Sequence, residues 1–200
     1  MAGPSTAKKR RTVGGLVLFH GAGGDRNHRL FLALEDRLGL PVARVNFPYR
    51  DKGPGRRPPD RMPVLIDTVQ QAVAEAADNW GIRPWRVAVG GRSMGGRAAS
   101  MAVADGLNAA ALVLLSYPLH PPGKPDRLRV DHFDRIERPV LLVQGRKDPF
   151  GTPEEFAAHV PAISGPVTEH WLDGNHDPRP SRDDEIIESV SQFLAGPLPG

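Results

Sequence analysis

Gly90-Gly91-Arg92-Ser93-Met94-Gly95-Gly96 is the stretch of the sequence that decides the fold. It follows an apolar run that ends at Val89 and precedes an alanine-rich segment over residues 97–105, so it lies where a predicted strand passes into a predicted helix. Its central five residues match the pattern G-x-S-x-G, which places a serine on a tight, strained turn. A Cβ atom at either flanking glycine would clash with the neighbouring strand or helix. We therefore predict that the hydroxyl of Ser93 is held at the carboxyl edge of a sheet, at a helix N-terminus that favours negative charge.

Two nucleotide-binding interpretations of these glycines fail on spacing. A phosphate-binding loop of the Walker type requires Lys and then Ser or Thr after its second glycine, where this chain has Arg97 and Ala98. A dinucleotide fingerprint requires G-x-G-x-x-G, and the stretch lacks that spacing. The alternative that stays open is that Ser93 is a small residue where a helix packs closely on a sheet.

Short apolar runs alternate with helical patterns along the rest of the chain, which is typical of a parallel sheet with crossover helices. Strands are predicted over residues 13–19, 41–47, 85–89, 109–116, 140–144 and 166–172, and two proline-rich segments, 48–62 and 117–139, are predicted to lack regular structure. Residues such as Asp60, Thr152 with Glu155, and Ser181 are predicted helix caps. The pattern indicates an α/β fold: one domain with a mostly parallel sheet of about six strands, helices on both faces and no large cap domain.

Length and composition agree with a single globular domain. The chain has 200 residues, of which 40% are hydrophobic and 24% charged. We expect a basic, disordered leader over residues 1–12, the domain over 13–196 and a short tail over 197–200. The apolar runs are too short to cross a membrane, and without a signal peptide the expected location is the cytoplasm.

The absence of cysteine excludes disulfides, thiolate metal sites and a cysteine nucleophile. We expect neither a metal nor a cofactor. The net charge of +3 is concentrated in the leader and in the segment 50–61, which leaves the remaining residues net negative. A body of that sign argues against a nucleic-acid partner, so the expected partner is a small molecule.

A serine needs a base and an orienting acid, which in this topology follow it in the order acid, then histidine, on loops after later strands. Asp148 directly follows the strand predicted over 140–144, and His176 follows the strand that ends at Leu172. The other acids of the last loop, Asp173 and Asp177, are better explained as loop and capping residues. Histidines elsewhere lie within elements, at helix ends or before the acid, where a structural role is more common; these are His28, His120, His132, His159 and His170.

Donors for a developing oxyanion are predicted in the run His20-Gly21-Ala22-Gly23-Gly24, at the end of the first strand. We predict the N–H groups of Ala22 and Met94 as the two donors, and the N–H of Gly23 is the next candidate after that of Ala22. The run also fits a plain glycine-rich turn. Arg92 is the predicted contact for a substrate carboxylate, and Gly23 lies at the same binding site. The remaining candidates for an anionic substrate fit a solvent-facing loop better; they are Arg50, Arg56, Arg57 and Arg61.

These stretches together resemble the α/β-hydrolase superfamily, over about residues 13–195. The stretches 20–24, 46–49, 90–97, 117–124 and 144–151 are similar to one small lidless branch related to dienelactone hydrolases, which also contains a testis-expressed hydrolase-like protein and the hydrolase-like domain of a chromatin-complex subunit. The resemblance implies triad roles for Ser93, Asp148 and His176. The chain departs from the wider superfamily in lacking its first two strands, and from dienelactone hydrolases proper in having Ser93 where they use cysteine.

The resulting hypothesis is a serine hydrolase, of the carboxylesterase or thioesterase kind, that cleaves an ester or thioester of a small acyl substrate through an acyl-enzyme. Two alternatives stay open: a binding or scaffolding module that keeps the hydrolase fold with little or no turnover, and an acyltransferase that passes the acyl group to an acceptor other than water.

Overall fold

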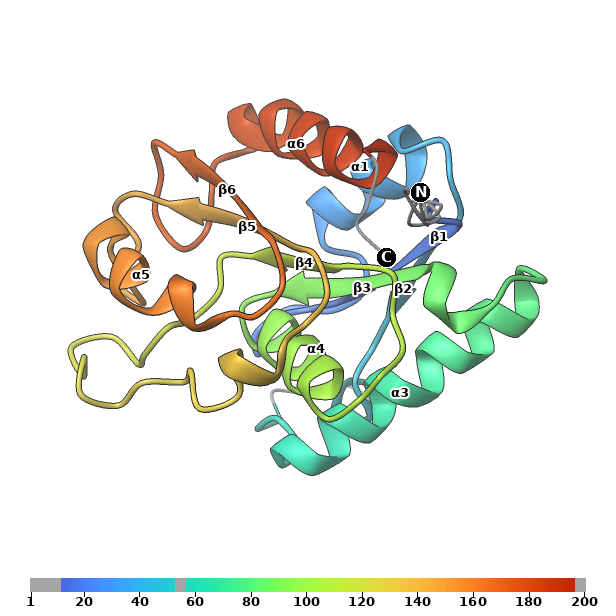
Figure 1. Ribbon diagram of the computed structural model, residues 1–200, viewed down its shortest axis with the longest axis horizontal. Coiled ribbons are helices and arrows are strands. Elements are labelled where there is room, and N and C mark those ends of the chain that lie inside the picture. The colour runs from blue at the N-terminus through green and yellow to red at the C-terminus, as the bar shows by residue number, and fades with distance from the viewer. Residues whose placement is uncertain (1–11, 53–56, 197–200) are drawn as a thin grey trace, which may run out of the picture.

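A six-stranded parallel sheet forms the centre of the molecule, as the computed structural model shows for residues 12–52 and 57–196 (Figure 1). The strands lie in the order β2-β1-β3-β4-β5-β6, and each neighbouring pair is parallel. Their bounds are β1 Gly15–Phe19, β2 Val42–Val45, β3 Val87–Arg92, β4 Leu112–Leu115, β5 Val140–Gly145 and β6 Val167–Leu172. The predicted α/β architecture and all six predicted strands are confirmed.

Helices cover both faces of this sheet (Figure 1). One face carries α3 (Met62–Asn79) and α4 (Met94–Ala104), and the other carries α1 (Arg29–Arg37) and α6 (Asp183–Ala195). The buried side chains separate accordingly into two cores, one with Val69 and Ala98 and the other with Phe31 and Ile187. Strand residues alternate between these cores, because successive side chains of a strand point to opposite faces. The shorter helices are α2 (Pro48–Asp51) and α5 (Pro153–His159).

The strand order reverses its direction across the sheet between β1 and β3. From β1 the chain passes outward to β2, returns through α3, and enters β3 on the other side of β1. The loops that follow β1 and β3 therefore leave the sheet in different directions, and ligands of open α/β sheets bind at such points. The run 20–24 follows β1 and Ser93 follows β3, so both lie at this position.

Several local predictions need correction. The segment 48–62 is not wholly irregular, because Pro48–Asp51 forms a helical turn with proline at a position that a helix start tolerates. Asp60 does not cap α3; its carboxylate accepts the Tyr49 N–H at 2.9 Å, and α3 begins at Met62. Ser181 lies in a 3-10 turn, Pro180–Arg182, and α6 begins at Asp183 with three acidic residues in its first turn. The capping box of Thr152 and Glu155 is confirmed.

The predicted leader and tail fall almost entirely outside the described residues, as does Arg56. The segment 117–139 is irregular apart from a 3-10 turn, Phe133–Arg135. In the described part of the chain, no helix combines the length and the apolar character that a membrane crossing requires.

Candidate active site

Ser93 lies on a strained turn between β3 and α4. Its φ of 53° and ψ of −117° fall in a region that residues other than glycine rarely adopt. The turn is close against β1: a Cβ atom added to Gly91 or to Gly95 would lie 2.2 Å from the carbonyl oxygen of Phe19. The glycines are thus required for the steric reason that the sequence pattern predicts, and the backbone conformation projects the serine at the N-terminus of α4.

A chain of hydrogen bonds joins Ser93 to His176 and Asp148. Nε2 of His176 lies 2.8 Å from Oγ of Ser93, and Nδ1 of the same ring lies 2.8 Å from Oδ2 of Asp148. The three residues come from the loops after β3, β5 and β6, so the structure brings together three side chains that are far apart in the sequence.

Asp148 is fully buried at its side chain and has further donors. Its Oδ2 accepts from Nε2 of Gln144 at 2.7 Å, and its Oδ1 accepts from the N–H of Phe150 at 2.8 Å. An ionised carboxylate only accepts hydrogen bonds, so the nitrogen of His176 that faces Asp148 must be the donor. We therefore assign the ring proton to Nδ1 of His176. Nε2 is then free to accept the hydroxyl proton of Ser93.

The ring of His176 is also held by packing. It stacks on Phe150 with ring centroids 4.0 Å apart and an angle of 27° between the planes. Sequence reasoning missed both Gln144 and Phe150. The signals were a polar residue at the end of an otherwise apolar strand, four residues before the acid, and an aromatic residue two positions after it.

The loops that carry Asp148 and His176 form one unit. The N–H of Lys147 donates to the carbonyl of Gly174 at 2.9 Å, and the N–H of Arg146 donates to the carbonyl of Leu172 at 2.9 Å. A Cβ atom on Gly145 would lie 2.5 Å from the Gly174 oxygen, so the backbones touch. The distance between acid and histidine is therefore fixed by main-chain contacts as well as by the side chains.

The glycine-rich run after β1 lies against Ser93, because a Cβ atom on Gly21 would be 3.4 Å from the Cβ of Ser93. Side chains from the segment after β2 hold the carbonyl groups of this run. The hydroxyl of Tyr49 donates to the Ala22 carbonyl at 2.9 Å, while Nε and Nη2 of Arg50 donate to the carbonyls of Gly24 and Gly23 at 2.6 and 3.3 Å. We call Tyr49 and Arg50 the loop clamp.

His20 adds to this connection between the two loops. Its Nε2 accepts the N–H of Phe47 at 3.1 Å, so its Nδ1 is the donor to the carbonyl of Gly21, at 2.8 Å. Burial lowers the pKa of His20, which favours this neutral form. Of the other loop arginines, Arg57 is exposed and donates to the Lys52 carbonyl at 2.9 Å.

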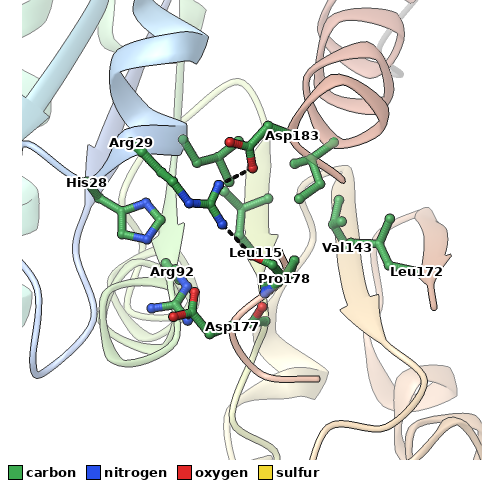
Figure 2. A pocket seen from close by; sticks show the side chains of 12 residues that line it. His28, Arg29, Arg92, Leu115, Val143, Leu172, Asp177, Pro178 and Asp183 are labelled. Atoms are coloured by element: carbon green, nitrogen blue, oxygen red, sulfur yellow. Dashed lines mark hydrogen bonds and ion pairs between the residues drawn. The ribbon is translucent and has the colours of Figure 1, made fainter. Parts of the chain in front are cut away.

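Arg92, the predicted carboxylate contact, lies against residues of its own chain (Figure 2). Its Nη2 donates to the carbonyl of His176 at 2.8 Å and lies 2.9 Å from Oδ1 of Asp177. It lines a cavity of about 10 Å³, which it shares with His28 and with Arg29, whose guanidinium pairs with Asp183. That volume holds about one water molecule and no acyl chain. A role of Arg92 in substrate binding stays a prediction; Nη2 is engaged by groups of the chain, and Nε is buried without a hydrogen-bond partner.

Three further histidines have polar partners away from Ser93. Nε2 of His120 lies 3.3 Å from Glu155, that of His170 lies 3.1 Å from Glu185, and that of His132 lies 2.8 Å from Oγ of Ser100. Burial, with a contribution from the charge of Arg97, lowers the pKa of His132 to about 4. Across the described ranges, no group of three histidine, aspartate or glutamate side chains is arranged to hold a metal ion.

Fold and sequence together define a class of protein. A family model described as an alpha/beta hydrolase domain matches residues 12–192. The chain belongs to this family.

Solved structures of similar fold have related descriptions. An alpha-beta serine hydrolase homologue from Coxiella burnetii has a TM-score of 0.72 at 22% identity, with 94% of this chain and 88% of that chain covered. A dienelactone hydrolase from Anabaena variabilis has a TM-score of 0.70 at 18% identity, with coverage of 94% and 88%. The RedJ thioesterase from the prodiginine biosynthetic pathway of Streptomyces coelicolor has a TM-score of 0.66 at 22% identity, with coverage of 90% and 86%. At these identities the likeness establishes the fold.

Proposed function

We propose that the chain is a serine hydrolase that cleaves an ester or thioester of a small acyl substrate. The observation that carries the proposal is the pair of 2.8 Å hydrogen bonds that connects Ser93 through His176 to the buried Asp148. A serine hydroxyl is a weak nucleophile at neutral pH unless a base accepts its proton, and this arrangement supplies the base with its orienting acid. The thioesterase and the dienelactone hydrolase of similar fold are consistent with this class of reaction.

In the first half of the reaction, Oγ of Ser93 attacks the carbonyl carbon while its proton passes to Nε2 of His176. The carboxylate of Asp148 stabilises the imidazolium that forms. The tetrahedral intermediate collapses when the bond to the leaving oxygen or sulfur breaks, and the leaving group takes the proton from Nε2. An acyl ester on Ser93 results.

In the second half, water attacks the acyl ester and gives a proton to Nε2. Collapse of this intermediate returns the proton to Oγ of Ser93 and releases the carboxylic acid. Each step uses only groups of this chain and water, so the cycle balances without a cofactor.

The oxyanion of both intermediates would be bound by the N–H groups of Met94 and Ala22. Met94 is the first residue of α4, directly after the nucleophile, and the run 20–24 lies against Ser93. The loop clamp supports this role, because it engages carbonyl groups of the run and leaves amide groups for an anion. Each such donor contributes about 3 to 4 kcal/mol of transition-state stabilisation.

The test is an assay of 4-nitrophenyl acetate hydrolysis, in which the release of 4-nitrophenol is measured. The wild-type protein should turn the ester over, and Ser93→Ala should abolish turnover while the protein stays folded by circular dichroism. Ser181→Ala removes an exposed serine from the turn before α6 and should keep full activity. Turnover that survives in Ser93→Ala would refute the nucleophile, and a folded wild-type protein that hydrolyses no ester or thioester of an acyl panel would favour a binding or scaffolding module.

A further inference from the structure

Two arginines that the proposed reaction does not use bind the loop that carries His176. Nη2 of Arg92, the last residue of β3, donates to the main-chain carbonyl of His176 at 2.8 Å. Arg29, the first residue of α1, donates to the carbonyl of Pro178, two positions further along the loop (Figure 2). Guanidinium groups from two other elements therefore hold the main chain at the histidine and just after it.

The same loop is anchored before the histidine by main-chain contacts. The carbonyl of Gly174 accepts the N–H of Lys147 at 2.9 Å, which connects the loop to that of the acid. Beyond Gly174, the carbonyl groups of His176 and Pro178 are bound by the two arginine side chains. The histidine thus lies between a main-chain anchor on the side of the acid and an arginine anchor on the side of the nucleophile. Loss of the second anchor leaves the contacts with the acid loop in place but frees the ring to move relative to the nucleophile.

Arg92 also lies beside the glycine-rich run after β1. A Cβ atom on Gly21 would be 3.8 Å from Nη1 of Arg92 and 3.4 Å from the Cβ of Ser93. One guanidinium therefore lies between the run that is proposed to bind the oxyanion and the loop that carries the base. Because Arg92 and Ser93 are consecutive residues, the position of this guanidinium is tied to that of the nucleophile.

The placement of Arg92 is unfavourable for folding stability. Its side chain is only 15% exposed, and burial lowers its pKa, whereas the charge of Asp177 raises it. The carboxylate of Asp177 is 70% exposed, so solvent weakens this ion pair. Nε of Arg92 is buried without a hydrogen-bond partner. Apolar side chains often replace a buried charge without loss of stability, so stability alone does not explain an arginine at this position.

Arg29 connects the histidine loop to two helices. Its guanidinium forms an ion pair with Asp183, the first residue of α6, and also donates to the carbonyl of Pro178 (Figure 2). The side chain of Asp183 is largely buried. The start of α1, the loop and the start of α6 therefore meet at one side chain, and a shift of the loop would break its contact there.

We propose that Arg92 and Arg29 are positioning residues: they hold the main chain of the histidine loop so that Nε2 stays within hydrogen-bond distance of Oγ of Ser93. This inference rests on the proposed function, and it assigns to Arg92 a role other than the predicted contact with a substrate carboxylate. Proton transfer requires the base within hydrogen-bond reach, and a displacement of about 1 Å costs about a hundredfold in rate. The two arginines act on kcat through His176.

Steady-state kinetics with 4-nitrophenyl acetate test this role in variants that circular dichroism shows to be folded. Arg92→Met removes the guanidinium and keeps an apolar stem, and it should lower kcat by about thirtyfold or more with KM changed less than about twofold. Arg29→Met should lower kcat by about fivefold, because its contact lies two residues beyond His176. The matched control is Arg37→Met, which removes an exposed ion pair with Asp184 between the same two helices and should keep the wild-type constants.

Matched esters separate positioning from substrate binding. The mono-4-nitrophenyl ester of glutaric acid and 4-nitrophenyl valerate have acyl groups of equal length, and only the first carries a terminal carboxylate. Arg92→Met should lower kcat/KM for the two esters by factors that agree within about twofold. A loss confined to the glutarate ester would show that Arg92 binds the substrate and would overturn the proposal.

Hydrogen exchange measures the hold on the loop without turnover. Amide exchange is followed by mass spectrometry in peptides that cover residues 173–182. It should be faster by about threefold or more in Arg92→Met than in the wild-type protein, and unchanged in Arg37→Met. Faster exchange in Arg92→Met supports the hold on the loop even in a protein that hydrolyses no ester, a result that would count against the proposed function alone. Unchanged exchange in Arg92→Met, or ester hydrolysis with wild-type kcat, would refute the positioning role and leave the hydrolase standing.

Discussion

The carboxylate of Asp148 has three hydrogen-bond donors, from Gln144, Phe150 and His176, and is closed off from solvent. Its geometry therefore does not depend on a bound substrate. Single-residue reasoning from the sequence predicted the serine, the acid and the histidine that the structure brings together, because each directly follows a strand. It did not predict Gln144 or Phe150, since their contribution depends on how the Asp148 loop bends back over β5, and spacing alone does not reveal that.

At the scale of single residues, Asp148→Asn should lower kcat for 4-nitrophenyl acetate by about a thousandfold or more. An amide at this position presents a donor or a weaker acceptor to Nδ1 of His176, so the ring loses the tautomer that accepts the Ser93 proton. The measurement is steady-state kinetics on the folded variant. Asp173→Asn, an exposed acid of the histidine loop, is the control, and equal losses in the two variants would show that Asp148 has no special role.

At the scale of elements, the segment after β2 holds the glycine-rich run after β1 in place through hydrogen bonds to its carbonyl groups. The sequence predicted segment 48–62 to be an irregular, charged loop, with Arg50 facing the solvent or an anionic substrate. Instead α2 directs Tyr49 and Arg50 toward carbonyl groups of residues 22–24. Proline and arginine content indicated exposure, and no local pattern reveals a contact with a run about 26 residues earlier in the chain.

We expect the loop clamp to act on kcat. Tyr49→Phe removes one hydroxyl donor without changing the shape of the residue, and Arg50→Met removes the donors to Gly23 and Gly24. Each variant should lower kcat about tenfold with KM changed less than twofold, because a displaced amide of the run stabilises the transition state less than before.

The matched control for the clamp is Arg57→Met, at an exposed arginine that contacts the Lys52 carbonyl. Its kinetic constants should equal those of the wild-type protein. Clamp variants that keep full kcat, or that change only the melting temperature, would show that Tyr49 and Arg50 stabilise the loop without a role in the reaction.

At the scale of the whole molecule, the two-sided core was well predicted, because buried parallel strands have an unmistakable apolar pattern, as in Leu112–Leu115 and Val140–Val143. The sequence did not predict the cluster of buried side chains that joins α4 to the segment 117–139. Ser100, Tyr117 and His132 are polar or aromatic residues far apart in the sequence, and only the folded chain brings them together: Ser100 is hydrogen-bonded to His132 and also contacts Tyr117. This cluster links the stability of the molecule to pH.

His132 should make the protein less stable as the pH falls from about 6.5 to about 4. The folded protein keeps this histidine neutral down to a pKa of about 4, whereas the unfolded chain binds a proton near the ordinary pKa of 6.5. The unfolded state therefore binds more protons in this window, so acidification favours unfolding by up to about 3 kcal/mol from this residue. Below about pH 4 both states are protonated and the loss no longer grows.

Urea unfolding at several pH values between 7 and 4 measures this contribution. The free energy of unfolding of His132→Gln should fall less steeply with acidification than that of the wild-type protein, whatever its value at pH 7. His159→Gln, at the end of α5, serves as the control and should keep the wild-type slope. An unchanged slope in His132→Gln would assign the acid sensitivity to other groups.

The most direct test of the proposed nucleophile is the site at which a fluorophosphonate labels the folded protein, determined by peptide mass spectrometry at neutral pH. Such a reagent reacts with a serine only when a neighbouring base activates it. We expect one modified peptide, with the label on Ser93, and loss of the label in His176→Asn. A folded wild-type protein that takes up no label, or takes it up at another residue, would contradict the claim that His176 and Asp148 make Ser93 a nucleophile.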